Sequence, residues 1–113
     1  MSTATDIAIT ALRAFDLKNQ VIANNIANMN TDGFKKSRAD MTQTSFPGMT
    51  VSVQQVNTPG DTVTLGGVER EASNVNLEEE MISLMVNTQN YEANIRTLKT
   101  TQEMQGTLFD LIG

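Results

Sequence analysis

The 113-residue sequence contains no cysteine, no histidine and no tryptophan. Without cysteine the chain can form no disulfide and offers no thiol nucleophile, and without histidine it lacks the usual imidazole acid–base group. A zinc site built from the usual ligands is excluded for the same reason. Aromatic residues make up only 4% of the sequence against 39% hydrophobic residues. The apolar side chains are therefore mainly aliphatic, which favours contacts along helices over a thick core.

Long hydrophobic runs and an excess of positive charge are also absent. No window approaches the roughly eighteen apolar residues that a membrane-spanning helix needs, so no membrane span is predicted. The first residues, MSTATDIAITALRAFD, have no basic stretch ahead of an apolar one, so no cleaved secretory signal is expected. Eight Lys/Arg against thirteen Asp/Glu give a net charge of −5, which argues against a general nucleic-acid binder.

The motifs that could carry chemistry are weak. Residues 28–33, NMNTDG, match the opening of an EF-hand loop, but the position of the bidentate glutamate is Ala39. The run of glutamates at 78–80 does not converge, because consecutive residues on a helix point about 100° apart. We predict no catalytic residue, no metal site, no cofactor and no enzymatic activity.

Glycine and proline divide the chain into three parts. Both prolines and most of the glycines lie within residues 31–67, where they favour turns and strands over helix. We predict a mainly α fold with an N-terminal coiled-coil helix in residues 1–30 and a C-terminal coiled-coil helix in residues 73–113. The two helices form an antiparallel coiled coil, and residues 31–72 form a loop and β-rich insert with a small β-hairpin.

Spacings of alternately four and three residues predict a coiled-coil seam, the row of side chains that faces the partner helix. In the first helix the seam comprises Ala8, Leu12, Phe15, Asn19, Ile22, Ile26 and Met29. In the second it comprises Leu77, Met81, Leu84, Thr88, Tyr91, Ile95, Leu98, Gln102, Gln105, Phe109 and Ile112. Pairing the polar interruptions sets Asn19 opposite Thr88, since a lone polar group in an apolar seam is costly.

Local signals predict how these elements begin and end. Asn76 is the expected N-cap of the second helix, Thr5 that of the first, and Gly33 the left-handed residue beyond the first helix. Residues 49–53 and 63–65 alternate like strands, and we expect them to pair through a turn at 58–61.

Two features point beyond a single folded chain. Apolar residues such as Ile82, Met85 and Leu108 lie off the predicted seam, and exposed apolar stripes usually mark a partner surface. Asparagines also crowd the second half of the first helix, where their helix propensity is poor. Either this helix end frays, or the amides bridge neighbouring helices.

Residues 19–38, NQVIANNIANMNTDGFKKSR, resemble the N-terminal signature of bacterial flagellar rod and hook proteins. Residues 73–104, SNVNLEEEMISLMVNTQNYEANIRTLKTTQEM, resemble the C-terminal signature of that family. The residues that match the first signature are Asn24, Asn25, Ile26, Ala27, Asn28, Asn30, Thr31, Gly33 and Phe34. Those that match the second are Ser73, Asn74, Val75, Asn76, Leu77, Glu80, Met81, Tyr91, Glu92, Ala93 and Asn94.

The resemblance implies a structural subunit of the flagellar basal-body rod that polymerises through its terminal helices. Its implied partners are other rod subunits, further copies of itself and the flagellar export apparatus, with no nucleic acid and no small-molecule substrate. The implied location is the periplasm-spanning rod, reached without a cleaved signal peptide, and the short insert favours the proximal rod. The alternative from another class is a soluble, dimeric helical adaptor or flagellar export chaperone.

Overall fold

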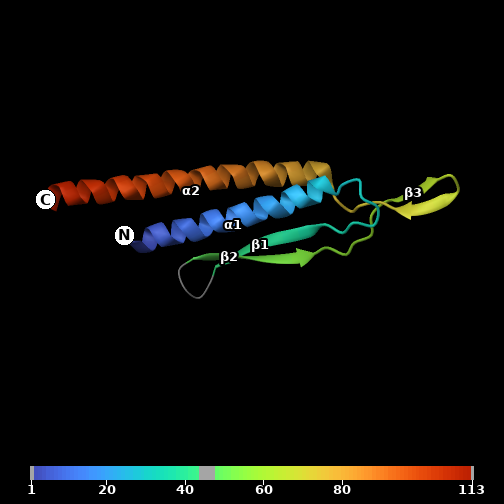
Figure 1. Cartoon of the computed structure of the whole chain (residues 1–113), viewed down its shortest axis with the longest axis horizontal. Helices are drawn as coiled ribbons and strands as arrows, with labels where there is room; N and C mark the ends of the chain where they lie inside the picture. The colour runs from blue at the N-terminus through green and yellow to red at the C-terminus, as the bar shows by residue number, and fades with distance from the viewer. Residues whose placement is uncertain (1, 44–47, 113) are drawn as a thin grey trace.

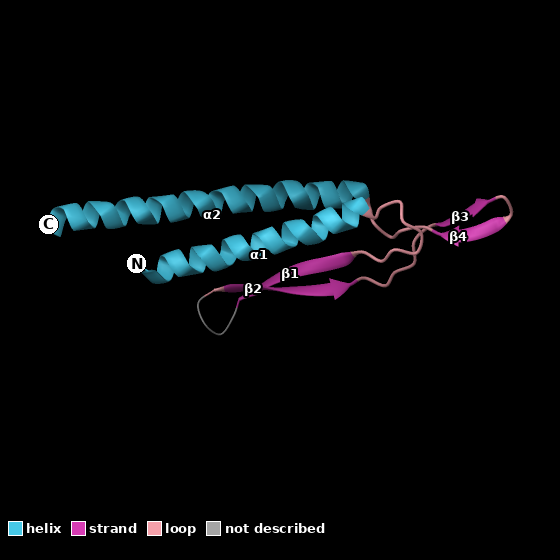
Figure 2. Ribbon diagram, viewed as in Figure 1, coloured by secondary structure: helices cyan, strands magenta, loops and turns pink. Residues whose placement is uncertain are grey.

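The computed structural model describes residues 2–43 and 48–112 and shows an elongated molecule of 78 × 26 × 14 Å. Its elements, in order, are α1 (Ser2–Ala27), β1 (Ser37–Gln43), β2 (Met49–Gln55), β3 (Thr62–Leu65), β4 (Val68–Glu71) and α2 (Leu77–Ile112). The two helices run antiparallel, β1 and β2 lie along α1, and the β3–β4 hairpin projects from one end (Figures 1 and 2). The predicted mainly α fold with a β insert is confirmed.

Helix α1 is the central element of the molecule, because it contacts α2 as well as β1 and β2. Its buried apolar side chains are mostly alanines, which let the neighbouring backbones approach closely. They are Ala8, Ala11, Ala14, Phe15 and Ile22. The helix begins at Ser2, so Thr5 is not its N-cap as predicted, since Thr5 lies within the first turn.

The turn after α1 follows the sequence prediction. Gly33 has a φ of 71°, a left-handed conformation that favours glycine. Its N–H donates a hydrogen bond of 2.8 Å to the carbonyl of Glu71, which joins the turn to the end of β4.

β2 and β3 are where the alternation predicts strands, but β1 and β4 were not predicted, and the pairing differs from the prediction. β2 pairs with β1, from Ser37 opposite Gln55 to Gln43 opposite Met49, and β3 pairs with β4. The expected pairing of 49–53 with 63–65 is wrong. Gly66 and Gly67, with φ values of 60° and 79°, form a two-residue turn that closes β3 onto β4 directly.

Helix α2 is capped as predicted. The Asn76 side-chain oxygen accepts hydrogen bonds from the N–H groups of Glu78 (3.0 Å) and Glu79 (3.3 Å), as an N-cap does. With 36 residues against 26 for α1, α2 is longer by about 15 Å and extends past the beginning of α1 (Figure 1). Neither described helix combines the length and the apolar character needed to cross a membrane.

Candidate assembly interface

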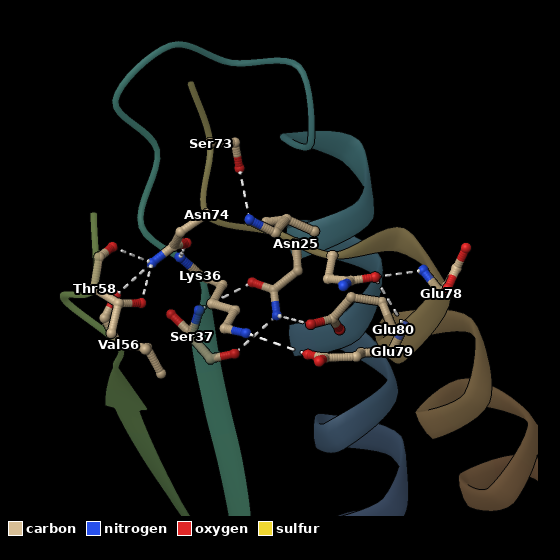
Figure 3. Close-up of polar contacts among 12 residues, drawn as sticks. Asn25, Lys36, Ser37, Val56, Thr58, Ser73, Asn74, Glu78, Glu79 and Glu80 are labelled. Carbon is tan, nitrogen blue, oxygen red and sulfur yellow. Dashed lines mark hydrogen bonds and ion pairs between the residues drawn. The ribbon is translucent and has the colours of Figure 1, made fainter. Parts of the chain in front are cut away.

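A buried asparagine joins three elements near the end of α1. Asn25 is 1% exposed, and its amide nitrogen donates to the Ser37 carbonyl of β1 (2.8 Å) and to Glu80 Oε1 of α2 (3.3 Å). Its amide oxygen accepts from the Ser37 N–H at 3.0 Å (Figure 3). Since buried polar groups cost free energy when unpaired, Asn25 fixes how α1, β1 and α2 meet.

A second buried asparagine, Asn87, joins the middle of the two helices. Its amide nitrogen donates to the Phe15 carbonyl at 2.8 Å and to the side-chain oxygen of Asn19. The Asn87 Oδ1 atom is buried and has no hydrogen-bond partner among the described residues. Asn19 therefore meets Asn87 and not Thr88, which is exposed, so the predicted pairing was one residue off.

The contact face of α2 is correspondingly shifted from the predicted seam. Buried or half-buried positions along α2 are Glu80, Leu84, Asn87, Tyr91, Asn94, Leu98, Thr101 and Gln105. Of the predicted seam residues, Leu84, Tyr91, Leu98 and Gln105 share this face. The others are exposed and lie outside the α1–α2 contact of a single chain: Leu77, Met81, Thr88, Ile95, Gln102, Phe109 and Ile112.

The shift has a physical cause. The Glu80 carboxylate and the amide nitrogen of Asn87 have hydrogen-bond partners on α1 and are buried with them, and buried polar groups are tolerated when they are so paired. The first helix keeps its predicted face. Phe15 and Ile22 are buried there, and Leu12, Asn19 and Ile26 are half-buried. Met29 is half-buried too, but it lies in the turn after Ala27, where α1 ends, and not in the helix as predicted.

Asn74 holds together the segments that connect the helices to the hairpins. Its side-chain nitrogen donates to the carbonyls of Val56 and Thr58, both at 2.9 Å. Its side-chain oxygen accepts from the Lys36 N–H at 2.7 Å, and its own N–H donates to the Phe34 carbonyl at 3.2 Å (Figure 3). Three connecting segments that are distant in sequence thus meet at one signature residue, Asn74.

An ion pair fixes the base of the projecting hairpin. The Lys35 ammonium contacts Glu71 Oε1, and the Gly60 N–H donates to the same oxygen at 3.2 Å. The hydrogen bond from Lys35, then that from Gly60 and then the Lys35 charge lower the pKa of Glu71 below its ordinary value of 4.5. The group is exposed, so this pair orients the hairpin more than it stabilises the chain.

The remaining signature residues are spread over the surface, apart from Asn24, Asn28 and Thr31, whose side chains are joined by hydrogen bonds of 3.2 and 3.1 Å. Asn24, Asn30, Thr31, Gly33, Glu92 and Ala93 are exposed, and Asn28, Phe34, Ser73 and Asn94 are half-buried. Asn28 and Asn94 donate to carbonyls one turn earlier in their own chain, those of Asn24 and Asn90, at 2.9 Å in both cases. The signature asparagines therefore divide into buried bridges and surface residues.

Most of the exposed large apolar side chains among the described residues lie on α2. They gather toward the two ends of the helix, with one between: Leu77, Met81, Ile82, Met85, Val86, Ile95, Met104, Leu108, Phe109, Leu111 and Ile112. Monomeric soluble proteins rarely expose large apolar patches, and such patches mark interaction sites.

Sequence reasoning had not assigned Glu80 and Asn87 to the helix contact. A signal for them exists, because Glu80, Asn87, Asn94 and Thr101 recur at every seventh residue. That spacing is the one a coiled-coil position requires. Because these residues are polar, the prediction chose the neighbouring row of more apolar residues instead.

Comparison with known proteins gives two matches, one at each end of the chain. Residues 6–35 match the family "Flagella basal body rod protein", and residues 70–111 match "Flagellar basal body rod FlgEFG protein C-terminal". These segments cover most of α1 with the turn after it, and most of α2 with the residues just before it, and they include Asn25, Asn74 and Asn87. The chain belongs to the flagellar rod and hook protein family.

One curated relative in this flagellar rod and hook family is the flagellar hook protein FlgE of Escherichia coli (strain K12). It is 30% identical over 95 residues, which is 84% of this chain and 23% of the relative. The chain thus spans about a quarter of the length of that hook protein.

Proposed function

We propose that this chain is a structural subunit of the flagellar basal-body rod and polymerises through its two terminal helices. The observation that carries the proposal is the exposed apolar surface of α2, where Ile82, Met85 and Leu111 are 62%, 61% and 80% exposed in the single chain. Burying that surface against neighbouring subunits would stabilise a polymer by about 25 cal/mol for each Å² removed from water.

The proposed partners are further copies of this chain and other rod subunits, at the flagellar basal body, after passage through the flagellar export apparatus. Both helices are also the segments that match the rod families. The described β insert is only two short hairpins, which supports a proximal position in the rod. The proposal includes no catalysis, no cofactor, no nucleic acid and no small-molecule substrate.

The test is to locate the chain in a bacterium that carries it. A deletion strain is complemented with an epitope-tagged chain, and basal bodies are purified and imaged by electron microscopy. We expect the deletion to abolish motility, the tagged chain to restore it, and the tag to appear in the rod. A tagged chain that stays in the cytoplasm, absent from basal bodies, would contradict the proposal.

The alternative, a dimeric adaptor or export chaperone, is separated by a second measurement. A rod subunit that orders its partner surface on assembly should be monomeric at micromolar concentration by analytical ultracentrifugation. A stable dimer bound to another flagellar protein in cell extracts would support the alternative instead.

A further inference from the structure

The β3–β4 hairpin has one apolar face that nothing in the described chain covers. Directly opposed residues of a hairpin point to the same side, so the pairs Val63–Arg70 and Leu65–Val68 share one face. Val63, Leu65 and Val68 are 41%, 59% and 58% exposed. The hairpin packs against none of the other described helices and strands.

The opposite face of the same hairpin is polar. The pairs Thr62–Glu71 and Thr64–Glu69 lie there, with two carboxylates and two hydroxyls. A two-stranded hairpin alone is marginally stable in water, and an aliphatic face on such a hairpin gains stability only when a partner covers it. The apolar face is therefore the one that would gain from being covered, and Arg70 is its charged residue.

The other end of the molecule carries an open apolar surface of matching chemistry, on one face of a single helix. It runs along the last turns of α2 and is lined by Thr100, Glu103, Met104, Thr107, Leu108 and Leu111. Met104, Leu108 and Leu111 are 60%, 47% and 80% exposed. These positions are spaced three and four residues apart, as on one face of a helix, and Glu103 places a carboxylate at the edge of the aliphatic surface.

We infer that the β3–β4 hairpin of one copy docks on this open face of α2 in a second copy. Three aliphatic side chains on the hairpin meet three on the helix, and Arg70 pairs with Glu103. In the single chain Arg70 has an exposed ion pair with Asp32 at 3.5 Å, which is weak enough to be exchanged. This inference rests on the proposed function and names the surfaces through which the copies join.

Because of the shape of the molecule, this contact can form only between two copies of the chain. The hairpin and the far end of α2 lie at opposite ends of a molecule 78 Å long (Figure 1), so one chain cannot make the contact with itself. Different surfaces meet, which is a heterologous contact, and repeating it without ring closure produces a filament.

The contact is small, and this has a consequence for assembly. Six aliphatic side chains fall short of the roughly 1,000 Å² of buried area expected for a stable interface. The contact alone does not hold two free copies together. It adds to the helix contacts once a copy is already seated in the growing polymer, as linked weak sites do.

Disulfide cross-linking in purified basal bodies tests the inference, because the native chain has no cysteine. We expect the double variant Val68→Cys with Leu108→Cys to give a ladder of linked copies on oxidation. Each single variant and the pair Thr64→Cys with Leu108→Cys, which uses the polar hairpin face, are the controls and should give no ladder. Incorporation of the double variant without a ladder overturns the docking and leaves the proposed function intact.

A charge exchange tests the Arg70–Glu103 pairing independently. It remains informative if the double cysteine variant is not incorporated into the rod. Arg70→Glu and Glu103→Arg should each lower incorporation into the rod, and the double variant should restore it. The control Asp32→Asn removes the intrachain partner of Arg70 and should leave incorporation unchanged. Single variants without effect, or a double variant without rescue, overturn the pairing. Absence of the unmodified chain from basal bodies would overturn the proposed function itself.

Discussion

At the scale of single residues, buried amides decide how the helices meet. Asn25 and Asn87 are each 1% exposed and direct their donors at backbone carbonyls of other elements, Ser37 and Phe15. A hydrogen bond that is satisfied contributes about 1 kcal/mol, whereas a buried partner left alone costs about 1–3 kcal/mol. These residues therefore select one arrangement by making the alternatives costly.

Replacing Asn25 tests this directly. Asn25→Ala leaves the Ser37 N–H and carbonyl without their side-chain partner and removes a donor from Glu80, so we expect a loss of about 2–4 kcal/mol in unfolding free energy. The neighbouring Asn24 is exposed, and Asn24→Ala should change stability by less than about 0.5 kcal/mol. Urea unfolding followed by circular dichroism measures both. Equal effects would show that burial of Asn25 carries no special role.

The ion pair at the hairpin base predicts a pH dependence. Because the pKa of Glu71 is lowered in the folded chain, its contribution is present above the unfolded value and is lost as the pH falls through the folded value. An NMR titration should show the Glu71 carboxyl titrating below 4.5. Lys35→Met should raise that pKa toward 4.5 by removing its largest cause. An unchanged titration in Lys35→Met would contradict the assignment.

At the scale of elements, the connecting segments matter as much as the helices. Residues 60–61 and 72–73 lie side by side at the base of the β3–β4 hairpin, where the chain enters and leaves it. The Ala72 N–H donates there to the Asp61 carbonyl at 2.7 Å. A Cβ on Gly60 would overlap the Ala72 carbonyl oxygen and lie 2.7 Å from its carbon. This crossing therefore requires glycine at position 60.

Two glycine substitutions separate this requirement from ordinary helix propensity. Gly60→Ala must displace backbone, and we expect it to cost about 1–3 kcal/mol. A Cβ on Gly106, inside α2, meets nothing within 4 Å, so Gly106→Ala should stabilise the chain by about 0.5–1 kcal/mol. Thermal unfolding of both variants is the measurement. Stabilisation of the chain by Gly60→Ala would contradict the crossing.

The sequence predicts the elements better than their partners. Periodicity and the Asn76 cap place both helices, and alternation places β2 and β3, because these signals are local. The pairing of β1 with β2 escapes it, since residues 37–43, SRADMTQ, bury only Ala39. The sequence also does not predict the contact face of α2. A hydrophobic pattern places Glu80 and Asn87 on the solvent-exposed side, because their hydrogen-bond partners on α1 are known only from the three-dimensional structure.

At the scale of the whole molecule, the chain is elongated and exposes much of its apolar surface. Its radius of gyration is 19.9 Å, against about 13 Å for a globular chain of this length. The buried apolar side chains are few and mostly alanine, whereas large apolar side chains are exposed from one end of α2 to the other. In the proposed polymer, folding and assembly therefore use different surfaces and can be separated by substitution.

A pair of serine substitutions on α2 tests that separation. Ile82 and Met85 are exposed in the single chain, so Ile82→Ser with Met85→Ser should change its stability by no more than about 1 kcal/mol in total. The same pair should abolish incorporation into basal bodies. Ile22 is 4% exposed, and Ile22→Ser should destabilise the chain itself by about 3 kcal/mol. Normal incorporation of the double variant would contradict the role of this surface.

The polar contact between α1 and α2 also governs how the chain responds to temperature. Heat capacity rises when apolar surface is exposed on unfolding and falls when polar surface is exposed. A chain that buries amides and alanines should therefore have a heat-capacity change below the roughly 1.4–1.7 kcal/mol/K usual for its length. A smaller heat-capacity change gives a flatter stability curve, so the free energy of unfolding should change little between low and moderate temperatures.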